Sequence, residues 1–268
     1  MSSLTETGYA KLNLALHVRG KRDDGYHEIE TIFAFCEDGD VLSGEAADEL
    51  SLEVSGPFGA DTPVDDANLV IEAARVVRLA TGVSGGVRLH LIKNLPIASG
   101  IGGGSADAAA VLRLLTRLWE IEASDAVEVA PLLGADVPAC LLSTSSRGEG
   151  TGDRVEPIEL GLSGAPVLLV NPGVPLSTKA VFDRWGGRDR GPLGEWREGR
   201  NDLEAPAIAL VPAISAVLAW LSQQRGADFV RMAGSGATCF ALFADDDSRN
   251  RAASEVPAPW WHLATRLR

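Results

Sequence analysis

The sequence is poor in cysteine and carries fewer basic than acidic residues. Its only three cysteines, Cys36, Cys140 and Cys239, are far apart and lack the CxxC or Cys/His spacing of a metal or redox site. We therefore expect free core thiols in a reducing cytoplasm rather than a disulfide framework. Lysine and arginine number 24 against 37 acidic residues, a formal net charge of -13. Such a charge repels polyanions, so no nucleic acid or anionic membrane is expected as a partner.

Long apolar segments are also absent. The two uncharged stretches that reach the roughly 18 residues that span a bilayer, 160–178 and 205–224, are interrupted by proline and polar residues, so no membrane-spanning helix is expected. Residues 1–14 lack the basic and then apolar regions of a secretory signal, which favours a cytoplasmic protein. There is no internal repeat or low-complexity tract. With 46% hydrophobic and 23% charged residues, 268 residues can form one large globular domain or two modest ones.

Hydrophobic spacing predicts a mixed order of strands and helices. The first strand, residues 9–18, has one polar face and is followed by a Gly- and Asp-rich turn. The remaining strand candidates are residues 26–35, parts of 40–54, 87–92, 167–170, 229–232, 238–244 and 261–266, and the helix candidates are 68–80, 105–119, 125–133 and 213–224. The order lacks a regular βαβ alternation. A shift to Ser, Gly and charge at residues 143–164 predicts a crossing between two halves, and residues 185–200 are expected to form a surface loop.

A glycine-rich segment, LPIASGIGGGS at residues 95–105, joins a predicted strand to a predicted helix; we call it the glycine loop. Glycines let backbone N–H groups converge on an anion, and a helix start adds partial positive charge. No lysine follows the last glycine, so it is not a Walker A loop, and Ser105 replaces the third glycine of GxGxxG. The pattern favours a phosphate site over a flexible connection.

Three further positions are ambiguous from spacing alone. Asp136, in the segment LGADVP, is more often a helix N-cap than a catalyst. Lys11 and Asn13, on the polar face of the first strand, would ordinarily face solvent. The segment GSGAT at residues 234–238 is either a tight hairpin turn or a second amide-lined wall facing the glycine loop. The spacing of its residues does not distinguish between these two structures.

Together these segments resemble the three motifs of the GHMP kinases, named for galactokinase, homoserine kinase, mevalonate kinase and phosphomevalonate kinase. The motifs are AKLN at residues 10–13, the loop at 96–106 and the glycine turn at 234–236. More narrowly, AKLNLALHV at 10–18, GKRDDGYHE at 20–28 and LGADVP at 133–138 resemble the 4-diphosphocytidyl-2-C-methyl-D-erythritol kinase family. The DGYH segment is the discriminating piece, and the resemblance runs from residue 10 to about residue 243.

The resemblance implies an α+β, two-domain GHMP kinase fold. Residues 1–155 would form an N-terminal domain like ribosomal protein S5 domain 2, with the ATP phosphate loop and the catalytic residues. Residues 156–268 would form a ferredoxin-like C-terminal domain. The implied reaction is ATP- and Mg²⁺-dependent phosphorylation of the 2-hydroxyl of 4-diphosphocytidyl-2-C-methyl-D-erythritol, in the non-mevalonate (MEP) route to isoprenoid precursors. The chain would act as a monomer or weak homodimer, and no acidic ligand for Mg²⁺ stands out.

The resemblance also implies roles for individual residues. Asp136 would be the general base, and Lys11 the cation that keeps it ionised and steadies the attacking oxygen. The expected substrate-binding residues are Asn13, Tyr26, His27, Thr178 and Phe182; of these, Tyr26 and His27 would recognise cytosine, Phe182 would offer the opposite stacking face, and Thr178 would touch the substrate phosphates. The expected ATP-binding residues are Asn68, Lys93, Pro96, Ile97, Ala98, Ser99, Gly100, Ile101, Gly102, Gly103, Gly104, Ser105 and Ala106.

Two positions depart from the family pattern. Ala106 stands where a second serine usually ends the loop, and Ala233 stands where a hydroxyl residue is common. They motivate one alternative, a nucleotide-binding homologue without catalysis. The other alternative is a GHMP small-molecule kinase of homoserine or mevalonate type, from which Tyr26 and His27 would distinguish this chain.

Overall fold

A computed structural model describes residues 3–268, which fold into two compact units. Unit 1 comprises the chain up to Ala10 together with Asp38–Ile97 and Gly102–Ser143. Unit 2 comprises Lys11–Glu37, Ala98–Ile101 and Thr144–Arg268. The two longest strands, β1 (Leu4–Lys21) and β2 (His27–Ala47), each contribute to both units.

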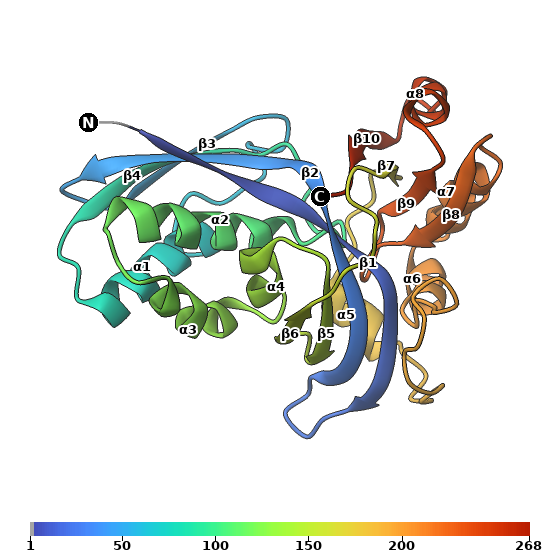
Figure 1. Cartoon of the computed structure of the whole chain (residues 1–268), viewed down its shortest axis with the longest axis horizontal. Coiled ribbons are helices and arrows are strands. Elements are labelled where there is room, and N and C mark those ends of the chain that lie inside the picture. The colour runs from blue at the N-terminus through green and yellow to red at the C-terminus, as the bar shows by residue number, and fades with distance from the viewer. Residues whose placement is uncertain (1–2) are drawn as a thin grey trace. The chain divides into compact units, whose positions relative to one another are not determined.

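Unit 1 packs helices against strands. Strand β4 (Gly86–Ile92) pairs antiparallel with Val41–Ala47 of β2 and parallel with β3 (Ser51–Ser55). Its helices are α1 (Leu69–Thr81), α2 (Gly103–Leu118), α3 (Ala123–Leu133) and α4 (Val137–Leu142). Helices α1, α2 and α3 lie together on one side of β3 and β4 (Figure 1).

Local sequence explains where the first helix begins and ends. Asn68 is the N-cap of α1, and its side chain accepts a 2.9 Å hydrogen bond from the backbone N–H of Val70. Gly82 closes the helix at φ 71°, a left-handed conformation that glycine adopts without cost. Between these ends, Val70, Ala74 and Val77 are buried at helical spacing. The helix therefore presents a continuous apolar stripe to the core.

Unit 2 contains a four-stranded antiparallel sheet in the order β10 (Trp261–Arg266), β7 (Pro166–Asn171), β9 (Cys239–Phe243) and β8 (Ala227–Met232). Helices α7 (Ala213–Ser222) and α8 (Asp246–Ser254) contact this sheet. The order β7-α7-β8-β9-α8-β10 along the chain, with sheet order 4-1-3-2, is the ferredoxin-like pattern. The expected ferredoxin-like fold is confirmed here.

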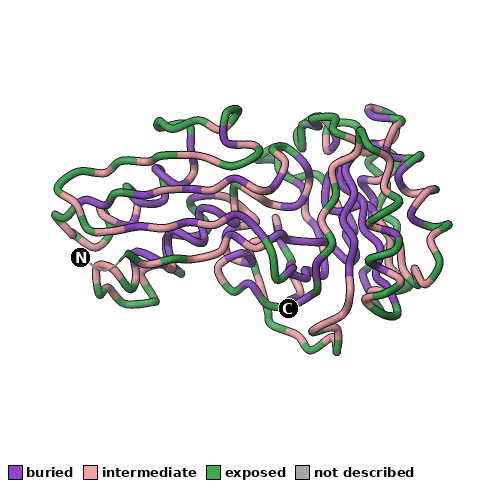
Figure 2. Tube along the Cα trace, turned by 90° about the horizontal axis from the view of Figure 1, so that it is seen from above, coloured by how far each residue is buried: buried purple, intermediate pink, exposed green. Residues whose placement is uncertain are grey.

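Unit 2 has further elements outside this sheet. Along the chain, some of them precede β7 and others lie between β7 and α7. Strand β5 (Ser146–Gly150) pairs with Ile29–Phe33 of β2 and with β6 (Arg154–Pro157). Two short helices follow β7: α5 (Thr178–Asp183) and α6 (Glu204–Leu210). Figure 2 shows that buried residues concentrate within strands and helices, whereas connecting loops are mostly exposed. As expected, residues 185–200 contain no helix or strand.

Most predicted elements are confirmed, and one expectation needs correction. The first strand does not expose a polar face, because Lys11 and Asn13 are only 3% and 1% exposed. The segment expected to form a crossing, residues 143–164, contains strands β5 and β6. The expected domain boundary at residue 155 stays a prediction. The two compact units divide the chain differently, because β1 and β2 each contribute residues to both units. Among residues 3–268, no helix is long and apolar enough to span a membrane.

Candidate active site

The glycine loop leads directly into helix α2. Gly102 is the N-cap, at φ 69°, and no side chain caps the helix. Gly104 is exposed, and Gly103 and Ser105 are half-buried. The first N–H groups of an α-helix have no partner within the helix, so an uncapped start of this kind is suited to an anion. The geometry fits the phosphate-binding role expected for these residues.

Residues 98–101 of the loop belong to unit 2 and pack against the turn between β8 and β9. The backbone N–H of Thr238 donates to the carbonyl of Ser99 at 3.1 Å. Gly100, at φ 80°, leaves no room for a side chain, because a Cβ there would fall 2.6 Å from the carbonyl oxygens of Ala233 and Gly236. The segment 234–238 is thus both a hairpin turn and a wall against the glycine loop.

Lys11 and Asn13 lie in unit 2, beside this loop. The backbone N–H of Lys11 donates to the carbonyl of Ile101 at 2.9 Å, which joins β1 to the loop. The Lys11 ammonium donates to Oδ1 of Asn13 at 2.9 Å and lies 5.2 Å from the centre of the Phe33 ring. Asn13 in turn donates to Thr31 at 2.8 Å. These contacts fix a buried cation close to the loop.

Thr178 lies beside the glycine turn of unit 2. Its hydroxyl is 2.9 Å from the hydroxyl of Ser235, within hydrogen-bond distance. Ser177 caps helix α5 and places Thr178 as the first residue of that helix. Two hydroxyl groups from distant segments are thereby brought together. Ser235 was missed by the sequence reasoning, which treated its segment as backbone only.

Of the residues expected to recognise cytosine, His27 and Phe182 have rings in contact, whereas Tyr26 is largely exposed. The rings of His27 and Phe182 lie 4.9 Å apart, tilted by 32°, and Trp185 meets His27 edge-on at 5.7 Å. Burial lowers the pKa of His27, with a smaller contribution from Lys21, so its imidazole is neutral at pH 7. Tyr26 is 61% exposed, so much of its side chain is open to solvent.

Asp136 and the two residues expected near adenine lie in unit 1. Asp136 is the half-buried N-cap residue of α4, which confirms its capping position, although its side chain makes no capping hydrogen bond. Asn68 caps α1 and also donates to the carbonyl of Pro63 at 2.6 Å. Lys93 is 3% exposed and pairs with two carboxylates, Asp40 and Asp107. The side chains of Asn68 and Lys93 thus already have partners within the protein.

Arg113 was missed by the sequence reasoning, yet it ties helix α4 to helix α2. Its guanidinium donates to the carbonyl of Cys140 at 2.9 Å and to the hydroxyl of Ser143 at 3.3 Å, at the C-terminal end of α4. It also donates to Glu6 at 3.0 Å. Fixing that end of a six-residue helix also limits how far Asp136, at the other end, can move.

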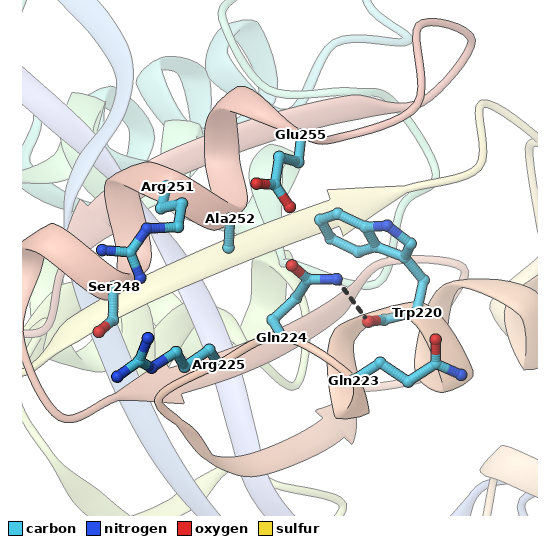
Figure 3. Close-up of a pocket in the computed structure, with 8 residues that line it drawn as sticks. All are labelled: Trp220, Gln223, Gln224, Arg225, Ser248, Arg251, Ala252 and Glu255. Carbon is cyan, nitrogen blue, oxygen red and sulfur yellow. Dashed lines mark hydrogen bonds between the residues drawn. The ribbon is translucent and has the colours of Figure 1, made fainter.

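Unit 2 has a separate hollow of about 370 Å³ between α7 and α8 (Figure 3). Figure 3 shows Arg225 and Arg251 near Ser248, with Glu255 toward Trp220. None of the residues that line it is a predicted site residue. Among residues 3–268, no group of three His, Cys, Asp or Glu side chains could hold a metal ion.

Comparison with known proteins matches both halves of the chain to kinase domains. Residues 68–144 match the GHMP kinases N terminal domain and residues 181–260 match the GHMP kinases C terminal domain. The chain is 51% identical to the 4-diphosphocytidyl-2-C-methyl-D-erythritol kinase of Rhizorhabdus wittichii, covering 98% of this chain and 94% of that protein. It is also 51% identical to the enzyme of the same name from Novosphingobium aromaticivorans, covering 99% and 93%.

Solved structures agree with the sequence matches. A crystal structure of 4-(cytidine 5'-diphospho)-2C-methyl-D-erythritol kinase superposes with a TM-score of 0.85 at 34% identity, over 98% of this chain and 99% of that chain. A homoserine kinase from Cytophaga hutchinsonii superposes with a TM-score of 0.74 at 14% identity, over 100% and 95% of the two chains. The second likeness concerns the fold alone.

Proposed function

Because this chain belongs to the 4-diphosphocytidyl-2-C-methyl-D-erythritol kinase family of the GHMP kinases, we propose that it transfers the γ-phosphoryl group of ATP to the 2-hydroxyl of that alcohol. The reaction is a step of the non-mevalonate (MEP) route to isoprenoid precursors. The observation that carries the proposal is the 51% identity to curated relatives over almost the whole chain. None of the three buried cysteines is in a disulfide, which supports the proposal of a cytoplasmic location.

In this proposal the ATP phosphates rest on residues 96–106, which comprise most of the glycine loop together with Ala106. Phosphoryl transfer asks a protein mainly for positioning and charge neutralisation. The uncapped start of α2 supplies backbone N–H donors and the positive end of a helix dipole. Ala106 is only 2% exposed, so we assign no phosphate contact to its side chain, and the proposed site relies on backbone N–H groups.

We assign the proton transfer to Asp136 and the supporting charge to Lys11. A carboxylate within hydrogen-bond distance of the substrate hydroxyl accepts its proton as the phosphoryl group transfers. The Lys11 ammonium stabilises the negative charge that develops on the attacking oxygen. Its hydrogen bond to Asn13 holds the flexible lysine in one orientation, so less side-chain entropy is lost when substrate binds.

We assign recognition of the cytosine base to Tyr26, His27 and Phe182. Tyr26 offers an exposed aromatic ring, and an aromatic ring suits stacking on a planar base. A neutral His27 imidazole has both a donor and an acceptor nitrogen, as the edge of an uncharged base requires. Phe182 packs beside His27 at 4.9 Å, and Thr178 is assigned to the diphosphate.

Mg²⁺ fits this site only as a partner of the nucleotide. Proteins commonly bind Mg²⁺ through one or two carboxylates together with substrate phosphates. The described residues, 3–268, offer no three-residue acidic cage. We therefore propose that the ion accompanies ATP, and we assign no residue of this chain as its ligand. Asn68 and Lys93 stay proposed contacts for adenine and ribose, although both side chains have protein partners.

The direct test incubates the purified chain with ATP, Mg²⁺ and 4-diphosphocytidyl-2-C-methyl-D-erythritol and follows ADP release. Homoserine and mevalonate serve as control alcohols, because each is the substrate of a GHMP kinase of the same fold. We expect turnover with the cytidine compound alone. Turnover with a control alcohol, or none with the cytidine compound, would contradict the proposed substrate.

A further inference from the structure

A buried cluster of three ionisable side chains lies in unit 1. The Lys93 ammonium pairs with Oδ2 of Asp40 and donates to Oδ2 of Asp107 at 2.6 Å. Lys93, Asp40 and Asp107 are 3%, 0% and 4% exposed, respectively. Charged groups removed from water persist only where their partners compensate for lost solvation. The cluster is therefore held in one geometry rather than exchanging partners as a surface ion pair does.

Asp40 ties this cluster to the residues that precede the glycines. Its Oδ1 accepts from the backbone N–H of Asn94 at 2.6 Å and of Leu95 at 2.8 Å. The Asn94 side chain donates to the carbonyl of Gly39 at 3.1 Å, next to Asp40 in β2. The chain that leads into Pro96 is thus attached to β2 by three hydrogen bonds.

Asp107 ties the same cluster to the residues that follow the glycines. It is the fifth residue of α2, whose first residue is Gly103. A Cβ on Gly103 would lie 3.1 Å from the Lys93 Nζ, which places the ammonium directly beside the start of that helix. One cation therefore links the two ends of the glycine loop, through Asp40 on one side and Asp107 on the other.

We propose that Asp40, Lys93 and Asp107 act as positioning residues that set the spacing between the two ends of the glycine loop, and so aim its N–H groups at the ATP phosphates. The proposal rests on the function proposed above. In it, the Lys93 ammonium acts through the two carboxylates rather than by direct contact with phosphate. We call these three residues the loop clamp.

The charge balance of the loop clamp agrees with this role. Asp40 accepts hydrogen bonds from Lys93 and two backbone N–H groups, whereas Oδ1 of Asp107 has no hydrogen-bond partner among the described residues. Burial raises the pKa of Asp107 to about 8, an effect that Lys93 partly offsets. With that carboxyl protonated near pH 7, the clamp carries no net negative charge close to the phosphate site.

The test measures binding of a non-hydrolysable ATP analogue, without any alcohol, by isothermal titration calorimetry. Omitting the alcohol separates this test from the proposed substrate, because a wrong alcohol cannot change analogue binding. We expect Asp40→Asn and Asp107→Ala each to weaken analogue binding about tenfold or more, the magnitude typical for loss of a residue that orients a metal ligand. Asp107→Asn, which keeps the shape and an acceptor for Lys93, should stay within about threefold.

The matched control is Glu6→Gln, which removes two other ion pairs of unit 1, from Glu6 to Arg113 at 3.0 Å and from Glu6 to Arg117 at 2.8 Å. It should lower the melting temperature without changing analogue binding. If Asp40→Asn and Asp107→Ala also lower only the melting temperature, the clamp is merely structural and the proposal fails. Should Asp40→Asn not fold, the comparison of Asp107→Ala with Asp107→Asn decides, since equal affinity in the two would contradict the proposal.

Discussion

Gly100 and Gly234 pack backbone against backbone: a Cβ on Gly234 would fall 2.6 Å from the carbonyl oxygen of Gly100. Both have positive φ angles, 80° and 52°. Two independent requirements, conformation and space, thus exclude side chains here. The same contact fixes the shape of the glycine loop and that of the β8–β9 turn, which periodicity in the sequence could not reveal.

The contact predicts a large effect for Gly234→Ala. A positive φ costs a non-glycine residue about 1 kcal/mol, and an unrelieved clash adds about 1–3 kcal/mol more. The matched control is Gly161→Ala, where φ is 64° but nothing lies within 4 Å. Urea unfolding should show the control losing only the conformational cost. Equal losses in the two variants would contradict the packing described.

Replacement of Asp136 by asparagine tests the proposed general base. The variant keeps the size of the side chain but cannot accept the substrate proton. We expect kcat to fall about 10²- to 10⁴-fold with ATP-analogue affinity retained. Glu128→Gln, at an exposed position of α3, is the control and should retain full activity. An unchanged kcat in Asp136→Asn would show that Asp136 is not the general base, whereas an absence of turnover in the unsubstituted chain would favour the non-catalytic alternative that Ala106 and Ala233 motivate.

Base recognition predicts a selective loss of affinity at Tyr26. Removing the ring in Tyr26→Ala should raise KM for the cytidine substrate about tenfold, in line with the loss of about 1–3 kcal/mol of stacking, and leave KM for ATP unchanged. Leu79→Ala removes a side chain of unit 1 that is 83% exposed and should change neither KM. A parallel rise in both KM values of Tyr26→Ala would indicate a general structural defect instead.

The raised pKa of Asp107 predicts a pH dependence of stability. Its ordinary pKa is 3.8, and burial raises the pKa in the folded chain to about 8. Between these values the folded chain holds a proton that the unfolded chain releases, so this carboxyl lowers stability progressively as pH rises, up to about 8. Asp107→Asn has no such proton. Its free energy of unfolding should therefore rise relative to that of the wild type from about pH 4 to about pH 8. A difference that does not change with pH would contradict this.

The sequence predicted well those elements whose apolar spacing is regular. Helices α1 and α2 and the strands of the ferredoxin-like sheet follow uninterrupted patterns, and their positions agree with the structure. Strand β2 was predicted in two pieces because Glu37, Asp38 and Gly39 interrupt its alternation. Short elements such as α5 and β6 have too few residues for a periodic signal.

The site was predicted mainly through resemblance, and its supporting contacts were not predicted. From the sequence, Lys11 and Asn13 were expected to face solvent, because the polar face of a strand is normally exposed. Their burial depends on segments far along the chain, such as the loop residue Ile101. Asp40 and Lys93 are likewise 53 residues apart, and no local pattern records such a partnership.

The sharing of β1 and β2 between the units has a consequence for how the chain folds during synthesis. Every segment of unit 1 is complete once Ser143 has been made, whereas Lys11–Glu37 of unit 2 must wait for partners as distant as Arg268. Residues Leu16 and Cys36, for example, form bridges with Asn201 and Leu267. The parts of β1 and β2 that belong to unit 2 can pair with each other early, but their bridges to residues 201 and 267 form only when nearly the whole chain has been made.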